Sequence, residues 1–167
     1  MQKKYDATIS HSTIIRAMGN CFECAKKGIS HGENPFGACI IHQGNVISCE
    51  YDHAVSKNNP TAHAEVEAIC AALNSLNRCS FEGNTLLVTT CEPCPICVTA
   101  AKLVGVSHIF YGMSIATGKK RGYLKNSFSS TLCAEMLGGG IKIINYEEMF
   151  STEGLVDFWE THNKESI

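Results

Sequence analysis

The stretch TLLVTTCEPCPIC, residues 85–97, decides the fold because it joins a buried strand directly to a helix. Thr85–Thr90 is β-branched and largely apolar, as strands are, and a proline in the first helical turn favours a helix over Pro93–Val104. Upstream, Thr61 can cap a helix over Ala62–Leu76, which is rich in Ala, Val, Ile and Leu. A helix, a strand and a helix in succession indicate an α/β protein.

The same alternation continues on both sides of this unit. Apolar residues at three- and four-residue steps indicate amphipathic helices, and short apolar runs indicate strands. The predicted helices are His11–Gly28, Ser129–Leu137 and Thr152–Asn163, and the predicted strands are Phe36–His42, Val46–Cys49, Ser107–Tyr111 and Ile141–Ile144. We expect the first helix to end at its glycine, the first two strands to form a hairpin, and helices to cover both faces of the sheet.

Length and composition fit one folded domain, residues 1–167. The chain is 44% hydrophobic and 18% charged, which excludes a disordered tail. No apolar run approaches the roughly 18 residues of a membrane span, and the opening MQKKYDATIS lacks the apolar stretch of a secretory signal. We therefore expect a cytoplasmic protein, whose 10 cysteines stay reduced as buried side chains, metal ligands or reactive groups.

Charge argues against nucleic acid as the default partner. The chain has 14 basic and 16 acidic residues and a formal net charge of -2, so it has no overall attraction for phosphate. A basic run at Lys119–Arg121 is more typical of a solvated face than of an RNA contact. Small molecules are the favoured partners.

Two short motifs carry chemistry. Cys94 and Cys97 are three residues apart, so on a helix they share one face, and a helix N-terminus favours thiolates. With His63 as the third ligand, zinc would keep its fourth position for water, as in catalytic sites. Two thiolates cancel the charge of the dication, so a nearby base becomes useful, and Glu65 is the candidate.

Several alternatives stay open at this point. A lone Cys-x-x-Cys is equally compatible with buried thiols, and Cys91 could replace the histidine in a three-cysteine ligand set. His63 and Glu65 are two apart, which on an ideal helix separates them by about 200°. Elsewhere, Cys21 and Cys24 are expected to be buried thiols, and Phe158 and Trp159 to dock the last helix.

The segments NPTAHAEV, residues 59–66, and CEPCPIC, residues 91–97, resemble the zinc-dependent cytidine deaminase superfamily. Within it the chain is most similar to bacterial guanine deaminases and next to tRNA-specific adenosine deaminases, including Pro35-Phe36-Gly37-Ala38. The likeness covers roughly residues 10–112. It implies a three-layer α/β/α fold with a central five-stranded mixed sheet flanked by helices, usually a homodimer, with one zinc ion per chain between the two motif-bearing helices.

Site roles follow from the resemblance position by position. His63, Cys94 and Cys97 would be the zinc ligands, and Glu65 would carry protons between water and substrate. The substrate-binding residues would be Phe36, against the flat ring, together with Asp52 and Ala64.

The departures from the family pattern concern the substrate. These families usually place an asparagine where this chain has Asp52, and an ionised carboxylate only accepts hydrogen bonds. Either the substrate therefore carries an N–H at that point, or Asp52 is protonated. The acid by which guanine deaminases recognise their substrate is missing from Gly122–Asn126, and their terminal tyrosine from Asn163–Ile167. The sequence predicts a zinc-dependent deaminase of a small heterocyclic base or nucleoside, with a guanine-like purine favoured. A tRNA-specific adenosine deaminase and a non-catalytic zinc domain are the alternatives.

Overall fold

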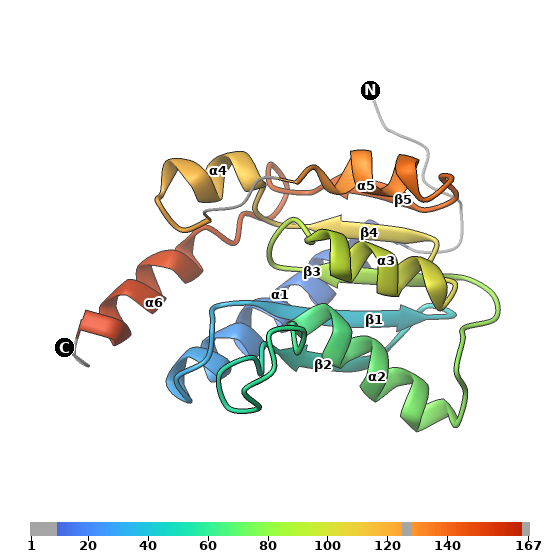
Figure 1. Ribbon diagram of the computed structural model, residues 1–167, viewed down its shortest axis with the longest axis horizontal. Coiled ribbons are helices and arrows are strands. Elements are labelled where there is room, and N and C mark those ends of the chain that lie inside the picture. Colours follow the sequence, from blue (N-terminus) through green and yellow to red (C-terminus); the bar gives the residue numbers. More distant parts are fainter. Residues whose placement is uncertain (1–9, 125–127, 165–167) are drawn as a thin grey trace.

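A mixed sheet forms the centre of the molecule. The computed structural model describes residues 10–124 and 128–164. Within them, five strands lie in the order β2-β1-β3-β4-β5 (Figure 1). The strand β1 runs antiparallel to β2 and β3, whereas β3, β4 and β5 are parallel. The strands are β1 Gly37–His42, β2 Asn45–Tyr51, β3 Thr85–Thr89, β4 His108–Tyr111 and β5 Lys142–Asn145.

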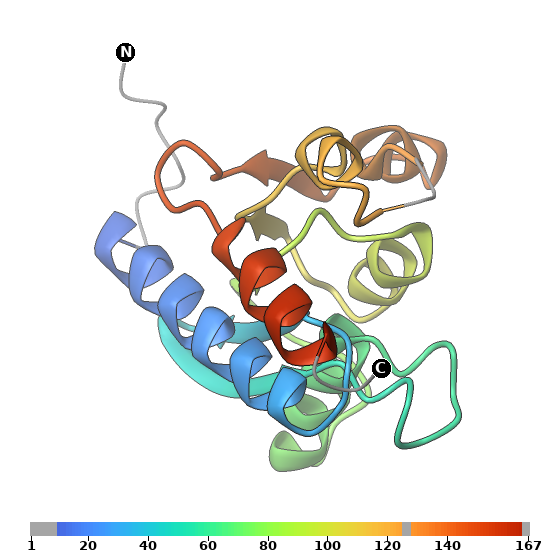
Figure 2. The same ribbon diagram turned by 90° about the vertical axis from the view of Figure 1, so that its left-hand side faces the viewer.

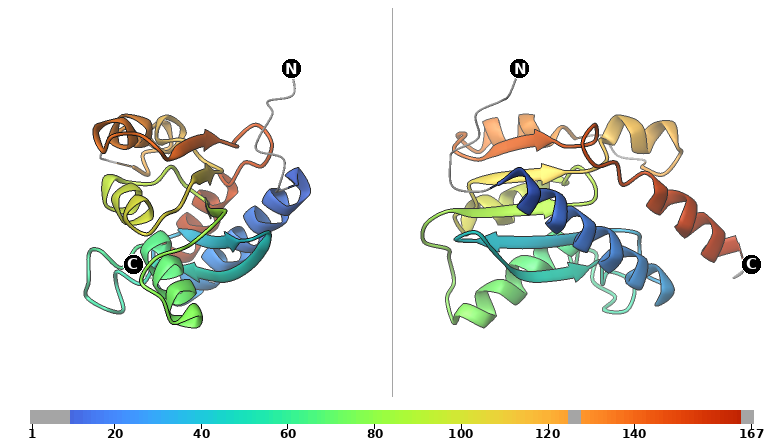
Figure 3. Two further views of the ribbon diagram at one scale, coloured as in Figure 1. Left: turned by 90° about the vertical axis from the view of Figure 1, so that its right-hand side faces the viewer. Right: turned by 180° about the vertical axis from the view of Figure 1, so that it is seen from behind.

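Helices cover both faces of this sheet. One face carries α2, α3 and α5, and the other carries α1, on which α6 lies (Figures 1 and 2). The view from behind shows α1 crossing the strands (Figure 3). The helices are α1 His11–Ser30, α2 Ala64–Leu76, α3 Pro95–Leu103, α4 Ile115–Lys120, α5 Ser130–Met136 and α6 Gly154–Lys164. The predicted three-layer α/β/α fold with a five-stranded mixed sheet is confirmed.

The core consists of two apolar layers, one on each side of the sheet. Neighbouring residues of a strand point to opposite faces, so Ile40 belongs to the layer under α2 and α3 while Ile41 belongs to the layer under α1. Leu87 and Val88 of β3 divide in the same way. The strands β1 and β3 are therefore buried throughout, and β2 is a half-buried edge strand.

The prediction that Gly28 ends the first helix is wrong. The helix continues to Ser30, and Gly28 lies inside it against Tyr51. A Cβ atom at Gly28 would come within 2.8 Å of the Tyr51 ring, so the glycine allows a close approach of helix and strand.

Two further helix starts differ from the prediction. Thr61 does not cap a helix, because its N–H and hydroxyl both donate to the side chain of Asn59, and α2 begins later, at Ala64. In the same way α3 begins at Pro95 rather than Pro93. The helix α4 was not predicted, since a helix of six residues shows little periodicity.

No helix in residues 10–124 and 128–164 has the length and apolar character that crossing a membrane requires.

Candidate metal centre and active site

The late helix starts bring the two motifs together. His63 and Cys94 are the N-cap residues of α2 and α3, both in extended conformation, and Cys97 is the third residue of α3. Because His63 lies before the helix, the 200° separation expected on an ideal helix does not apply to it and Glu65. Cys97 Sγ lies 3.5 Å from His63 Nδ1 and 3.3 Å from Glu65 Oε2.

The donor atoms have the spacing of a tetrahedral metal site. Ligand bonds of about 2.3 Å to sulfur and about 2.0 Å to nitrogen place two sulfurs about 3.8 Å apart and a sulfur about 3.5 Å from the nitrogen. Cys94 Sγ and Cys97 Sγ are 3.6 Å apart, and each lies 3.5 Å from His63 Nδ1. These three residues can therefore hold one ion with an open fourth position.

The electrostatics of the three donors suit a cation. Hydrogen bonding with Cys97 and with the His63 ring lowers the pKa of Cys94 to about 4, which favours its thiolate form. The hydrogen bond with Cys94 also raises the pKa of His63 to about 9. A divalent ion would displace the protons that His63 and Cys97 hold, because metals bind the deprotonated ligands.

Glu65 is held at the edge of this cluster. It is only 6% exposed, and its Oε1 accepts a hydrogen bond of 2.8 Å from Thr89 Oγ1 at the end of β3. Burial raises the pKa of Glu65 above its ordinary value. A carboxyl group with a raised pKa beside a metal cluster is suited to taking up and returning protons.

Phe36 and Asp52 lie next to each other at the end of the β1–β2 pair. The Asp52 N–H donates to the Phe36 carbonyl at 3.1 Å. The Asp52 carboxylate is 1% exposed, and its Oδ1 accepts hydrogen bonds of 3.0 Å from Asn34 Nδ2 and from the Ala54 N–H. Burial raises the pKa of Asp52.

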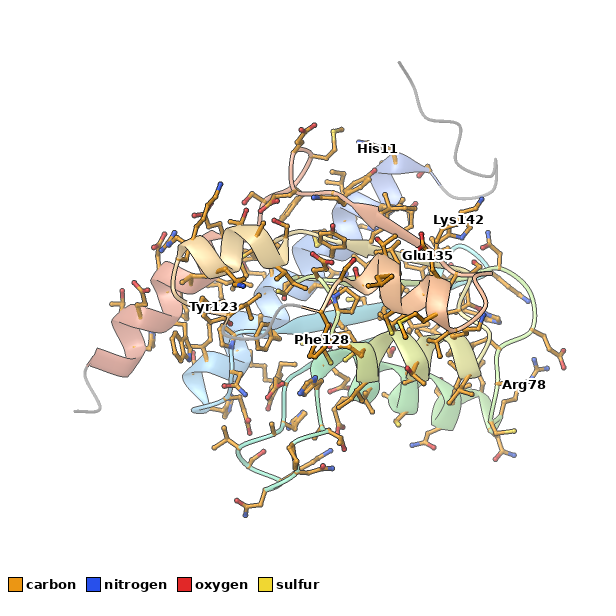
Figure 4. The ribbon with its side chains drawn as sticks, turned by 45° about the horizontal axis from the view of Figure 1, so that its top comes forward. His11, Arg78, Tyr123, Phe128, Glu135 and Lys142 are labelled. Atoms are coloured by element: carbon orange, nitrogen blue, oxygen red, sulfur yellow. The ribbon has the colours of Figure 1, made fainter. Side chains whose placement is uncertain are left out.

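Tyr123, in the segment after α4, lies beside Phe36. Figure 4 shows Tyr123 below α4, close to α6. Its ring lies 5.5 Å from that of Phe36 and 5.6 Å from that of Trp159. Among residues 10–124 and 128–164, the Tyr123 hydroxyl is a buried side-chain oxygen without a hydrogen-bond partner in the chain. Ala64, fully buried at the start of α2, completes the residues predicted for the site.

Other predicted features lie apart from this cluster. Cys91 is buried among Met113 and Val156 and is not one of the three grouped donors. Arg121 forms ion pairs with Glu153, at 2.9 Å, and with Asp157. Phe158 and Trp159 pack with α1 residues, which confirms their role in docking the last helix. Two of the stretches compared with guanine deaminases lie partly outside the described residues. These are Lys125 and Asn126, in the stretch that lacks the acid, and residues 165–167, in the stretch that lacks the tyrosine.

Three residues that hold the site in place were not predicted from the sequence. Thr89 orients Glu65, and Asn34 orients Asp52. Glu92 accepts from the Ile115 N–H at 3.0 Å and from Ser130 Oγ at 2.7 Å, which fixes α4 and α5 beside the site. Of these, only Glu92 carries a sequence signal, as a charged residue between a buried strand and the Cys-x-x-Cys motif.

Comparison with known proteins assigns the fold and the site to a family. Residues 11–113 match the family model of the cytidine and deoxycytidylate deaminase zinc-binding region. The chain belongs to this deaminase family. It is 33% identical over 116 residues to a guanine deaminase of Bacillus subtilis, covering 69% of this chain and 72% of that protein. It is 36% identical over 105 residues to a tRNA-specific adenosine deaminase of Aquifex aeolicus, covering 63% of this chain and 67% of that one.

A solved structure agrees with the deaminase fold. The guanine deaminase of Nitrosomonas europaea superposes with a TM-score of 0.72 at 18% sequence identity, over 89% of this chain and 83% of that one. The resemblance found in the sequence is thereby confirmed. The protein is a zinc-dependent deaminase, and its His and Cys side chains form a group able to hold the metal ion.

Proposed function

We propose that this deaminase acts on a small heterocyclic base or nucleoside, with a guanine-like purine favoured. It would replace the exocyclic amine by a carbonyl group and release ammonia. The observation that carries the proposal is the buried Glu65 carboxyl group, 3.3 Å from one sulfur of a three-donor metal cluster. A structural zinc site has no need of such a group.

The proposed mechanism assigns separate tasks to the residues around the cluster. His63, Cys94 and Cys97 would hold zinc, which when bound acts as a Lewis acid and makes water more acidic. Glu65 takes the proton of the attacking water and passes protons to the ring nitrogen and to the departing amine. Thr89 keeps one Glu65 oxygen fixed, so that the other faces the cluster.

Asp52 and Phe36 support a preference among flat heterocycles. Because Phe36 and Asp52 are backbone-paired, a ring lying on the Phe36 side chain would have one edge near the Asp52 carboxylate. Asn34 and the Ala54 N–H occupy Oδ1, and the remaining oxygen of an ionised Asp52 can only accept. We therefore propose a substrate with a ring N–H at that edge. The unpartnered Tyr123 hydroxyl offers a second polar contact.

A tRNA substrate fits the described surface less well. The tRNA-specific relatives make it the alternative, but tRNA binding requires basic groups free to contact phosphates. Arg121, the end of the basic run, is engaged by Glu153 and Asp157. With a net charge of -2, a free small molecule remains the favoured substrate.

Ammonia release by the zinc-loaded protein tests the proposal. The substrates are guanine, adenine, cytosine, isocytosine, their nucleosides, pterins and aminotriazines. Asp52→Asn should shift the preference toward purines that present an acceptor nitrogen, whereas Asp157→Asn, the same change on α6, should leave it unchanged. An unaltered profile in Asp52→Asn would remove Asp52 from the pocket. No release from any compound, with zinc bound, would favour RNA or a non-catalytic role.

The homodimer, the cytoplasmic location and the single domain stay predictions. Their support is the family resemblance and the composition of the sequence. The mass in solution, measured by light scattering, tests the dimer.

A further inference from the structure

A second cysteine cluster lies on the opposite side of the sheet from the metal donors. Cys21 of α1, Cys39 of β1 and Cys49 of β2 have all three sulfurs within 4.8 Å of one another. Cys39 Sγ and Cys49 Sγ are only 2.6 Å apart. On the same helix, the Cys24 thiol interacts with Cys49 as well. The deaminase chemistry uses none of these residues.

The strand register explains why Cys39 and Cys49 meet. They are directly opposite in the antiparallel β1–β2 ladder. The bond from the Asp52 N–H to the Phe36 carbonyl marks that opposed pair as hydrogen-bonded. Bonded and non-bonded pairs alternate along an antiparallel ladder. Three steps further on, Cys39 and Cys49 are therefore a non-hydrogen-bonded pair, in which Cα atoms are about 4.5 Å apart and side chains are closest. Disulfides span Cα separations of about 4.4–6.8 Å.

We propose that Cys39 and Cys49 are a thiol redox site that forms a reversible cross-strand disulfide. A shared metal ion is less well supported by the same cluster. Two thiolates on one tetrahedral zinc ion lie about 3.8 Å apart, and Cys39 and Cys49 are much closer.

The two sulfurs differ in exposure, so we assign them different roles in forming the disulfide. Cys49 is half-buried on the edge strand and can meet a peroxide, whereas Cys39 is fully buried. Hydrogen bonding with Cys21 and with Cys49 lowers the pKa of Cys39 to about 5, which favours the attacking thiolate. Hydrogen peroxide oxidises the Cys49 thiol to a sulfenic acid and leaves as water. The Cys39 sulfur then attacks the Cys49 sulfur, and hydroxide leaves and takes up the thiol proton.

This pair lies close along the chain to two residues proposed to bind the substrate. Cys39 follows Phe36 by three residues along one strand, and Cys49 precedes Asp52 by three along the other. A bond between the sulfurs ties the edge strand β2 to β1 close to Phe36 and Asp52. The inference does not depend on the proposed substrate, and its test measures no deaminase activity.

Peptide mapping of the zinc-loaded protein tests the proposal. After treatment with hydrogen peroxide and alkylation of remaining thiols, trypsin leaves Cys39 and Cys49 in one fragment, residues 28–57, because no Lys or Arg lies between them. We expect this fragment to escape alkylation at both cysteines and to be lighter by two hydrogen atoms. Glutathione should restore both thiols. Cys21 and Cys24 fall in another fragment, residues 17–26, so a bond from α1 to Cys49 would appear as a cross-link.

Matched variants separate the outcomes. Cys49→Ala should abolish the mass change, and Cys70→Ala, at an exposed cysteine of α2, should leave it intact. Alkylation of both Cys39 and Cys49 after oxidation would overturn the proposal. So would a cross-link between fragments 17–26 and 28–57. A second zinc ion per chain that is lost in Cys49→Ala would also overturn it, in favour of a metal site.

Discussion

Replacing Glu65 by glutamine separates catalysis from structure in this protein. The amide cannot accept the proton of water, and general acid–base groups contribute about 10²–10⁴-fold to rates. Since Glu65 would both take and return protons, we expect kcat to fall by about 10³–10⁴, or about 4–5.5 kcal/mol in the barrier. The amide oxygen can still accept the Thr89 hydrogen bond, and Glu65 is not among the three grouped donors, so zinc should stay bound.

Although Glu65→Gln should lower kcat, we expect it to leave the stability of the folded protein unchanged or higher. Burial raises the pKa of Glu65, so the ionised form is disfavoured in the folded state and stability is lost as pH rises through that pKa. A neutral amide removes this loss, and the melting temperature at pH 7 should be unchanged or higher. The assay combines ammonia release, zinc content and thermal unfolding. Glu67→Gln is the matched control, because Glu67 lies on the same helix and forms a 2.6 Å ion pair with Lys57 at the surface. Zinc loss in Glu65→Gln, or a kcat within about tenfold of the wild type, would refute the reasoning.

Three more predictions follow from single contacts. Cys94→Ser should lose zinc and Cys91→Ser should keep it, as measured by zinc content, and zinc loss in Cys91→Ser would restore the three-cysteine ligand set. Thr89→Val removes a 2.8 Å donor to Glu65, so the acid limb of kcat/KM against pH should move up by about 1–2 units, and an unmoved limb would exclude that role. Burial alone would raise the pKa of Glu33, but hydrogen bonds from two loop residues lower it. Its stabilising contribution is therefore present above its unfolded pKa and lost as pH falls below about 4.5, so urea unfolding of Glu33→Gln should show a deficit of about 1–3 kcal/mol only at neutral pH.

Local sequence predicted the parts of this protein that depend on neighbouring residues. The periodicity of α1 and the β-branched run of β3 each reflect one segment facing one apolar layer, so they could be recognised from spacing alone. The motifs around His63 and Cys94 could be recognised for the same reason. Helix starts were less predictable, since Thr61 is engaged by Asn59 in a turn that competes with capping.

The remaining parts of the site depend on contacts between segments far apart in the chain. Thr89 reaches Glu65 across 24 residues, and Asn34 reaches Asp52 across 18. Nothing in the local pattern marks either donor, because a threonine ending a strand and an asparagine in a turn are common. The pairing of Cys39 with Cys49 likewise depends on the strand register. The sequence predicted that the two strands form a hairpin, but it did not predict which residues face each other.

The sheet topology explains why these distant residues meet at one edge. Because β1 runs antiparallel to both its neighbours, its first residues lie beside the last residues of β2 and β3. The Thr90 N–H donates to the Gly37 carbonyl at 2.9 Å and fixes this junction. Phe36 enters β1 here, Asp52 leaves β2, and the chain leaving β3 turns into the cysteine motif. The motifs that set the chemistry and the residues proposed to select the substrate are thus joined by backbone hydrogen bonds. A substitution at Asp52 should therefore alter which ring is bound while leaving the metal donors in place.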